Sequence, residues 1–169
     1  LLAYDNLAML AEVGLLTEWF YPAATGQRLS ADAEAEFSAA WKAALQQLKV
    51  SAPVIILRDY HAENLLWLPG REGLARVGLL DVQLGQLGQP GYDLVSLLQD
   101  ARRDVAPETE AAMMARFASA TGAAPDRFAA HYAVLGAQRA LRILGVFARL
   151  SVKAGKPGYL RLLPRVWGQ

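Results

Sequence analysis

The sequence predicts an α+β domain that is mostly helical and has a small central β-hairpin. Three observations support this prediction. Apolar residues recur at helical spacing in the Ala-rich stretches on both sides of the middle of the chain. The middle, residues 53–80, holds three short apolar runs, and a turn sequence rich in Pro and Gly separates the last two. The chain has 169 residues, 54% hydrophobic and 20% charged, which suits one domain with a sizeable core.

Two helices are expected before the hairpin. Asp5 can cap the first, which should run to about residue 20 and end at Pro22. Ser30 can cap the second, which should run to about residue 48. Helical spacing in the second places a set of apolar residues on one side: Phe37, Trp41, Ala44, Leu45 and Leu48.

The apolar runs in the middle of the chain predict three strands. The β-branched run at 54–57 is typical of a buried strand. The runs at 65–68 and 77–80 predict the two strands of a hairpin with its turn at 69–73. Residues 82–91, rich in Gly and Gln, predict a loop.

Helices are expected in the rest of the sequence. Their predicted ranges are 92–101, 107–121, 126–150 and 158–166. Pro107 and Pro125 suit the first turns of two of these helices, and Gly122 suits a C-terminal stop.

Charge and composition disfavour several classes of protein. The net charge of +1, from 17 basic and 16 acidic residues, predicts no nucleic-acid partner and no attraction to an anionic membrane. No uninterrupted apolar run is long enough to span a bilayer. Without cysteine there is no disulfide, thiol nucleophile or thiolate metal site, and with no signal peptide in view we expect a cytoplasmic protein. The chain opens at Leu1 rather than Met, so we expect it to be part of a longer protein.

Three polar side chains lie at the ends of the predicted strands. Asp59 follows the first apolar run, Asn64 opens the second, and Asp81 directly follows the third. A short antiparallel hairpin would bring residues 59–64 close to Asp81. A carboxylate can orient an acceptor hydroxyl and take its proton, and an amide oxygen with a carboxylate suits Mg²⁺. The spacing therefore predicts phosphoryl transfer.

The residues around these positions resemble the aminoglycoside phosphotransferase family, which is related to choline kinases. Residues 57–66 (Leu-Arg-Asp-Tyr-His-Ala-Glu-Asn-Leu-Leu) resemble its catalytic loop, 79–83 its metal-binding strand end, and 91–98 the helix that follows. Residues 18–22, 145–150 and 159–166 resemble a branch of bacterial kinases that phosphorylate the anomeric position of N-acetylmuramate and N-acetylglucosamine. The resemblance implies a protein-kinase-like C-terminal lobe over residues 1–169, with its hairpin carrying the site and the ATP-gripping N-terminal lobe absent.

The resemblance also implies roles and ligands. Asp59 would be the catalytic carboxylate, Asn64 and Asp81 the Mg²⁺ ligands, and Asp93 a buried brace of the catalytic loop. The expected cofactors are ATP, or another nucleoside triphosphate, and Mg²⁺. The expected partners are the missing N-terminal lobe and a small-molecule acceptor: an amino sugar of cell-wall recycling, or an aminoglycoside-like molecule. Only 11 residues, 82–92, separate Asp81 from Asp93, too few for the activation segment of a protein kinase.

Two neighbouring residues have open roles. Arg58 either contacts a phosphate or substrate carboxylate, or is an arginine paired inside the protein. His61 either contacts substrate or phosphate, or packs and hydrogen-bonds within the loop. A zinc site at His61 and Glu63 is disfavoured because the only other histidine, His131, belongs to a separate predicted helix.

The chain also departs from the family pattern. Leu57, Val82 and Leu84 stand where the family or its amino-sugar branch usually has His, an aromatic residue and an acidic residue. No glycine-rich phosphate loop or strand lysine precedes the catalytic segment, so this chain alone is not expected to be a competent kinase. The alternative hypothesis is a non-catalytic binding or regulatory module derived from the same fold.

Overall fold

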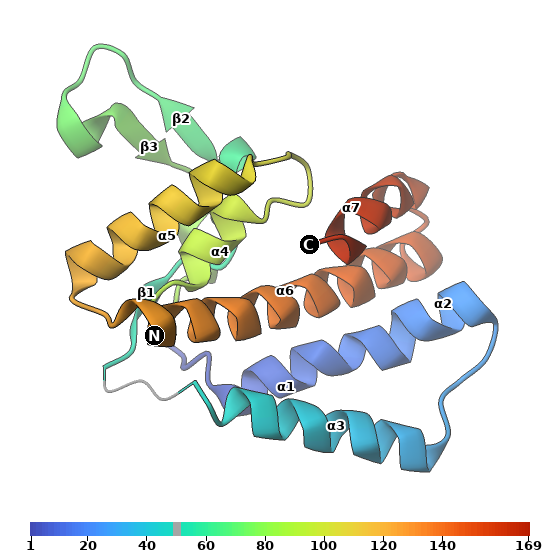
Figure 1. The fold of residues 1–169 in the computed structure, drawn as a ribbon. Helices are drawn as coiled ribbons and strands as arrows, with labels where there is room; N and C mark the ends of the chain where they lie inside the picture. The colour runs from blue at the N-terminus through green and yellow to red at the C-terminus, as the bar shows by residue number, and fades with distance from the viewer. Residues whose placement is uncertain (49–51) are drawn as a thin grey trace.

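One long helix, α6 (Pro125–Lys153), runs through the middle of the molecule, and most of the other helices pack against it (Figure 1). The computed structural model describes residues 1–48 and 52–169. Most of these residues lie in helices, which matches the predicted class. The α-helices in chain order are α1 (Asn6–Leu15), α2 (Tyr21–Thr25), α3 (Ala31–Leu45), α4 (Tyr92–Leu98), α5 (Pro107–Thr121), α6 (Pro125–Lys153) and α7 (Leu163–Trp167).

The first helix begins where predicted but continues further. The Asp5 carboxylate caps α1 by accepting a hydrogen bond from the Ala8 N–H (2.9 Å). After α1 the helix passes through a π-helical segment, Leu16–Phe20, directly into α2, so the prediction that Pro22 ends it was wrong. Pro22 lies in the first turn of α2, where its missing N–H is tolerated, and Gly26 (φ 72°) ends the helix instead.

The caps and breakers of the later helices agree with the sequence. The Ser30 hydroxyl caps α3 by accepting a hydrogen bond from the Ala33 N–H (3.2 Å), although α3 ends at Leu45 rather than near residue 48. Pro107 and Pro125 lie in the first turns of α5 and α6, and Gly122 (φ 68°) follows the end of α5. The helix predicted at 158–166 divides into a 3₁₀ helix, Pro157–Leu162, and α7.

The middle of the chain forms two small antiparallel sheets. Strands β2 (Leu65–Trp67) and β3 (Val77–Leu79) pair in the predicted hairpin, which projects from the helical body (Figure 1). Strand β1 (Val54–Ile56) pairs with β4 (Gln86–Gly88), inside the segment predicted as a loop. The loop prediction failed because Gly and Gln have little β-propensity, and the pairing with β1 sets this strand.

The expected burial of the first strand was also wrong. In β1, Val54 and Ile55 are exposed and only Ile56 is buried. A β-branched apolar run indicates a strand, but it does not reveal that the sheet has two strands and an open side. Ile56 packs in the core, so the residues that follow β1, from Leu57 onward, begin next to the helical body.

The core lies against α6 in two clusters. One joins α1, α3, α4, α5 and α6, and the other joins α6 to α7 and the chain around it. Gly145 allows α6 to approach the end of α1 closely, because a Cβ there would lie 2.6 Å from the Cβ of Leu15. Within the described ranges, no helix combines the length and apolar character that crossing a bilayer would require.

Candidate catalytic site

The segment that carries Asp59 and Asn64 connects the two sheets. It leaves β1 at Ile56 and enters β2 through a 3₁₀ turn, Ala62–Asn64. The Asn64 side-chain amide donates to the carbonyl oxygen of Asp59 (2.9 Å). At the open end of the hairpin, opposite its turn, the Leu80 N–H donates to the carbonyl oxygen of Asn64 (2.9 Å). Asn64 therefore lies beside Asp59 and beside the strand end that carries Asp81.

The Asp59 carboxylate faces outward from this segment. Its side chain is 43% exposed, and its Oδ1 lies 3.5 Å from Nε2 of His61. His61 is buried, with 4% of its surface exposed, and the same nitrogen lies 3.3 Å from the amide nitrogen of Asn64. The structure thus places His61 underneath Asp59 and Asn64, within the loop.

Asp93 of α4 holds the beginning of the loop. Its carboxylate accepts hydrogen bonds from the backbone N–H groups of Leu57 (2.7 Å) and Arg58 (3.0 Å). Burial raises the pKa of Asp93 above its ordinary value, against the opposing effect of these hydrogen bonds and of the positive charge of Arg139.

Two further side chains from the same region hold the loop, and neither was predicted from the sequence. The Ser96 hydroxyl donates to the carbonyl oxygen of Arg58 (3.3 Å). Asp100, only 1% exposed, accepts hydrogen bonds from the N–H groups of Ala62 (3.4 Å) and Arg102 (2.9 Å). Asp93, Ser96 and Asp100 follow one another at i, i+3 and i+7, so a polar stripe in an apolar segment was the signal that marked them.

Arg58 turns away from the open side of the site. Its guanidinium pairs with Glu12 of α1 and lies 4.5 Å above the ring centre of Tyr4. Its backbone has a positive φ of 65°. Glu12 was not selected from the sequence because it lies far from the motif along the chain, within an ordinary helical pattern.

Asn64 and Asp81, the metal ligands predicted from the sequence, each carry a side-chain oxygen of the kind that Mg²⁺ prefers. Both hydrogen bonds of the Asn64 side chain use its amide nitrogen, which leaves the amide oxygen to act as a ligand. Asp81 is exposed, has a φ of 56°, and accepts a hydrogen bond from the Gln83 side chain. Among the described residues, no group of three or more His, Cys, Asp or Glu side chains could hold a metal ion. Mg²⁺ commonly uses one or two protein ligands together with water and substrate phosphates, and this pair of donors fits such a site.

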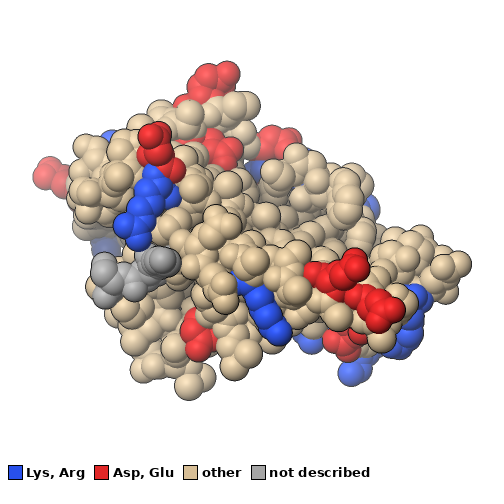
Figure 2. Space-filling model, turned by 60° about the horizontal axis from the view of Figure 1, so that its bottom comes forward, with Lys and Arg blue, Asp and Glu red and all other residues tan. Residues whose placement is uncertain are grey.

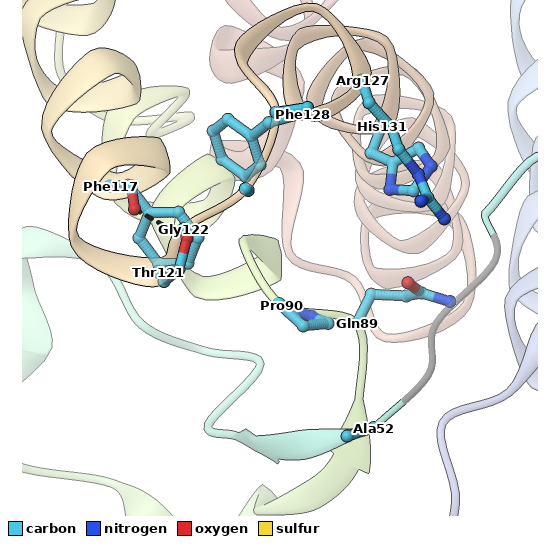
Figure 3. A pocket seen from close by; sticks show the side chains of 11 residues that line it. Ala52, Gln89, Pro90, Phe117, Thr121, Gly122, Arg127, Phe128 and His131 are labelled. Atoms are coloured by element: carbon cyan, nitrogen blue, oxygen red, sulfur yellow. Dashed lines mark hydrogen bonds between the residues drawn. The ribbon is translucent and has the colours of Figure 1, made fainter.

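A separate cavity of about 470 Å³ lies between the end of α5, the start of α6 and the turn before α4 (Figure 3). The stacked rings of Phe117 and Phe128 line it, with centroids 5.0 Å apart, and Gln89 and Pro90 line it from the turn. None of the candidate site residues named above lines this cavity. This cavity therefore lies outside the candidate catalytic site.

Charged side chains are dispersed on the face shown in Figure 2. Lys and Arg side chains form small separate groups there, with Asp and Glu side chains between them. This face therefore presents no continuous basic surface.

Comparison with known protein families gives the class of protein. The model of the phosphotransferase enzyme family matches residues 5–131, which is more than half of the chain. The chain belongs to this family, and the resemblance predicted from its sequence is confirmed.

Several curated proteins are similar in sequence to this chain, and they share one name. An N-acetylmuramate/N-acetylglucosamine kinase from Caulobacter vibrioides is 46% identical over 99% of this chain and 46% of its own length. Kinases of the same name from Neisseria meningitidis and Pseudomonas aeruginosa are 33% and 31% identical, each over 96% of this chain and 49% of their own length. The chain therefore spans about half the length of the curated relatives it matches.

Proposed function

We propose that this chain is the catalytic lobe of an ATP-dependent kinase that phosphorylates a hydroxyl of a small amino sugar. The main support comes from two hydrogen bonds of Asn64. Its side chain donates to the carbonyl oxygen of Asp59, and its own carbonyl oxygen accepts from the N–H of Leu80, the residue before Asp81. These two contacts support a site that would combine a catalytic carboxylate with two oxygen ligands for a metal. The names of the relatives support N-acetylmuramate or N-acetylglucosamine as the acceptor.

Asp59 is the proposed catalytic carboxylate. The acceptor hydroxyl oxygen forms a bond to the γ-phosphorus of ATP, the bond from that phosphorus to the bridging oxygen breaks, and ADP leaves. Asp59 orients the hydroxyl and takes its proton, a role that suits its exposed carboxylate, which lies 3.5 Å from Nε2 of His61. Asn64 and Asp81 would hold Mg²⁺, which neutralises phosphate charge when it is bound.

Asp93 is the proposed brace of this arrangement. Its two hydrogen bonds fix the backbone that leads into Asp59. This leaves the Asp59 side chain as the group that faces a substrate, whereas Arg58 and His61 support it from inside the protein.

The partner that completes the site is proposed to be a second lobe that grips ATP. Several large apolar side chains of the two sheets, and of the segment after β3 that carries Asp81, are exposed. They are Val54, Ile55, Leu66, Trp67, Val77, Leu79, Leu80, Val82 and Leu84. Clusters of this kind mark interaction surfaces, and a lobe seated here would cover them and lie over the phosphates. Use of ATP also predicts a cytoplasmic location.

The identity of the acceptor is tested by measuring how fast the full-length gene product forms ADP with each candidate acceptor. We expect turnover with Mg-ATP and N-acetylmuramate or N-acetylglucosamine, and none when Mg²⁺ is removed. Turnover only with an aminoglycoside or with choline would keep the kinase and change the substrate class. A lack of turnover with every acceptor would favour the non-catalytic binding module.

A further inference from the structure

The residue before Asp59 has a backbone conformation that its own chemistry disfavours. Arg58 has a φ of 65°, in the left-handed region where a Cβ crowds the following carbonyl oxygen. Such a conformation persists only when the surrounding structure imposes it. The contacts of Arg58 therefore decide where the next residue, Asp59, is placed.

Arg58 is held from both its backbone and its side chain. Asp93 accepts its N–H (3.0 Å) and Ser96 donates to its carbonyl oxygen (3.3 Å). The guanidinium is fixed separately, by the Glu12 carboxylate and by the face of the Tyr4 ring at 4.5 Å. The backbone contacts both come from α4, and the side-chain contacts come from the first residues of the chain and from α1.

Glu12 is the centre of the side-chain contacts. One of its carboxylate oxygens pairs with Arg58, and the other accepts a hydrogen bond from the Tyr4 hydroxyl and pairs with Nε of Arg142 (3.0 Å). Tyr4 is itself fixed, because its N–H donates to the carbonyl oxygen of Leu87 in β4 (2.7 Å). Glu12 thus connects α1, α6 and the first residues of the chain to the loop through one side chain.

We infer that Glu12 is a positioning residue that acts through Arg58 to hold Asp59 in its reactive placement. This inference rests on the proposed kinase function. Glu12 neutralises the Arg58 side chain and keeps it directed into the protein, against Tyr4. The left-handed turn at Arg58 then directs the Asp59 carboxylate to the exposed side, where the acceptor hydroxyl would lie.

The test compares Glu12→Gln with the unaltered full-length gene product. We expect kcat to fall by roughly tenfold or more while KM for ATP and for the acceptor stays the same, because a small misplacement of a reacting group has this effect. The kcat of Arg58→Gln should fall by a similar factor. The kcat of the double variant should be no lower than that of the slower single variant, because both substitutions remove the same Glu12–Arg58 interaction. Glu36→Gln, an exposed acid on α3, is the matched control and should keep full activity.

Folding is followed in the same experiment, because Glu12→Gln leaves Arg58 and Arg142 without their shared counter-charge. If Glu12→Gln has a lower Tm than the unaltered protein, the double variant is compared with Arg58→Gln alone. The double variant removes the charges of both Glu12 and Arg58, and its kcat should equal that of Arg58→Gln. Unchanged kcat in folded Glu12→Gln would overturn the inference. A raised KM for the acceptor with kcat retained would also overturn it, since Glu12 would then contact the acceptor.

Hydrogen exchange separates this inference from the proposed function. Without any substrate, Glu12→Gln should speed exchange at the Leu57 and Arg58 amides, whereas Glu36→Gln should not. Unchanged exchange would contradict the positioning contact. A gene product without turnover on any acceptor would refute the proposed function, and the exchange rates would still decide whether Glu12 orders the loop.

Discussion

Two residues other than glycine have a positive backbone φ at the candidate site. Of the residues that the structure describes, Arg58 and Asp81 are the non-glycine positions with this conformation, at 65° and 56°. One precedes the proposed catalytic carboxylate and the other is a proposed metal ligand. Backbone strain of this kind is often found where function needs a particular side-chain direction. Here it occurs at Arg58, next to Asp59, and at Asp81.

At the same scale, the titration of Asp93 gives a prediction about stability. Burial raises the pKa of Asp93 above the ordinary value of 3.8, so its folded pKa exceeds its unfolded pKa. Between these two values the folded protein binds more protons than the unfolded chain. The contribution of Asp93 to stability therefore falls as the pH rises through this window.

Urea unfolding of the wild type and of Asp93→Asn across this window measures the effect. The stability of the wild type relative to the variant should decrease as the pH rises from about 4 towards neutrality, because Asn does not titrate. An increase over the same range would show that the hydrogen bonds from Leu57 and Arg58 outweigh burial.

At the scale of elements, the close approach of α6 to α1 depends on a glycine. Gly145 has no room for a side chain, since an added Cβ would lie 2.6 Å from the Cβ of Leu15. Gly14, in α1, has nothing within 4 Å of an added Cβ. The two positions form a natural pair for the same substitution.

Gly145→Ala should destabilise the protein by about 1–3 kcal/mol through overpacking. Gly14→Ala should stabilise it by roughly 0.5–1 kcal/mol, because alanine favours the helix and nothing opposes its methyl group. Denaturant unfolding of both variants checks the sign of each change. A stabilising Gly145→Ala would mean that the two helices are not in contact at this point.

The elements that sequence reasoning predicted well are those with local signals. Helix α5 spans Pro107–Thr121 as expected, because a proline in the first turn and a glycine after the last turn mark both ends. Strand β4 was missed and β1 was wrongly expected to be buried, because both depend on pairing and covering by distant segments. The continuation of the first helix through Pro22 depended on a π-helical segment that has no clear sequence signal.

The candidate site divides in the same way. Asp59, Asn64, Asp81 and Asp93 belong to short motifs, and their spacing with the family resemblance was sufficient to select them. Glu12 enters the site only through tertiary packing, since it pairs with Arg58 across 46 positions of the chain. No local pattern of residue types distinguishes such a carboxylate from a solvent-exposed one.

At the scale of the whole molecule, the chain is a helical body with the candidate site at the base of its β2–β3 hairpin. It spans about half the length of its curated relatives, and the exposed strands beside Asn64 and Asp81 are where a second lobe is proposed to sit. In this proposed arrangement the described residues would supply the acceptor-facing carboxylate and the metal ligands. The other lobe would supply the grip on ATP that phosphoryl transfer also needs.

Phosphate transfer by the full-length Asp59→Asn variant tests the central claim most directly. The substitution keeps the size of the side chain and removes the proton acceptor. We expect kcat on the amino sugar to fall by about 10² or more, as for loss of a general base. Asp126→Asn, an exposed acid at the start of α6, should behave as the wild type. Equal turnover by the wild type and Asp59→Asn would contradict the assignment of Asp59 as the catalytic carboxylate.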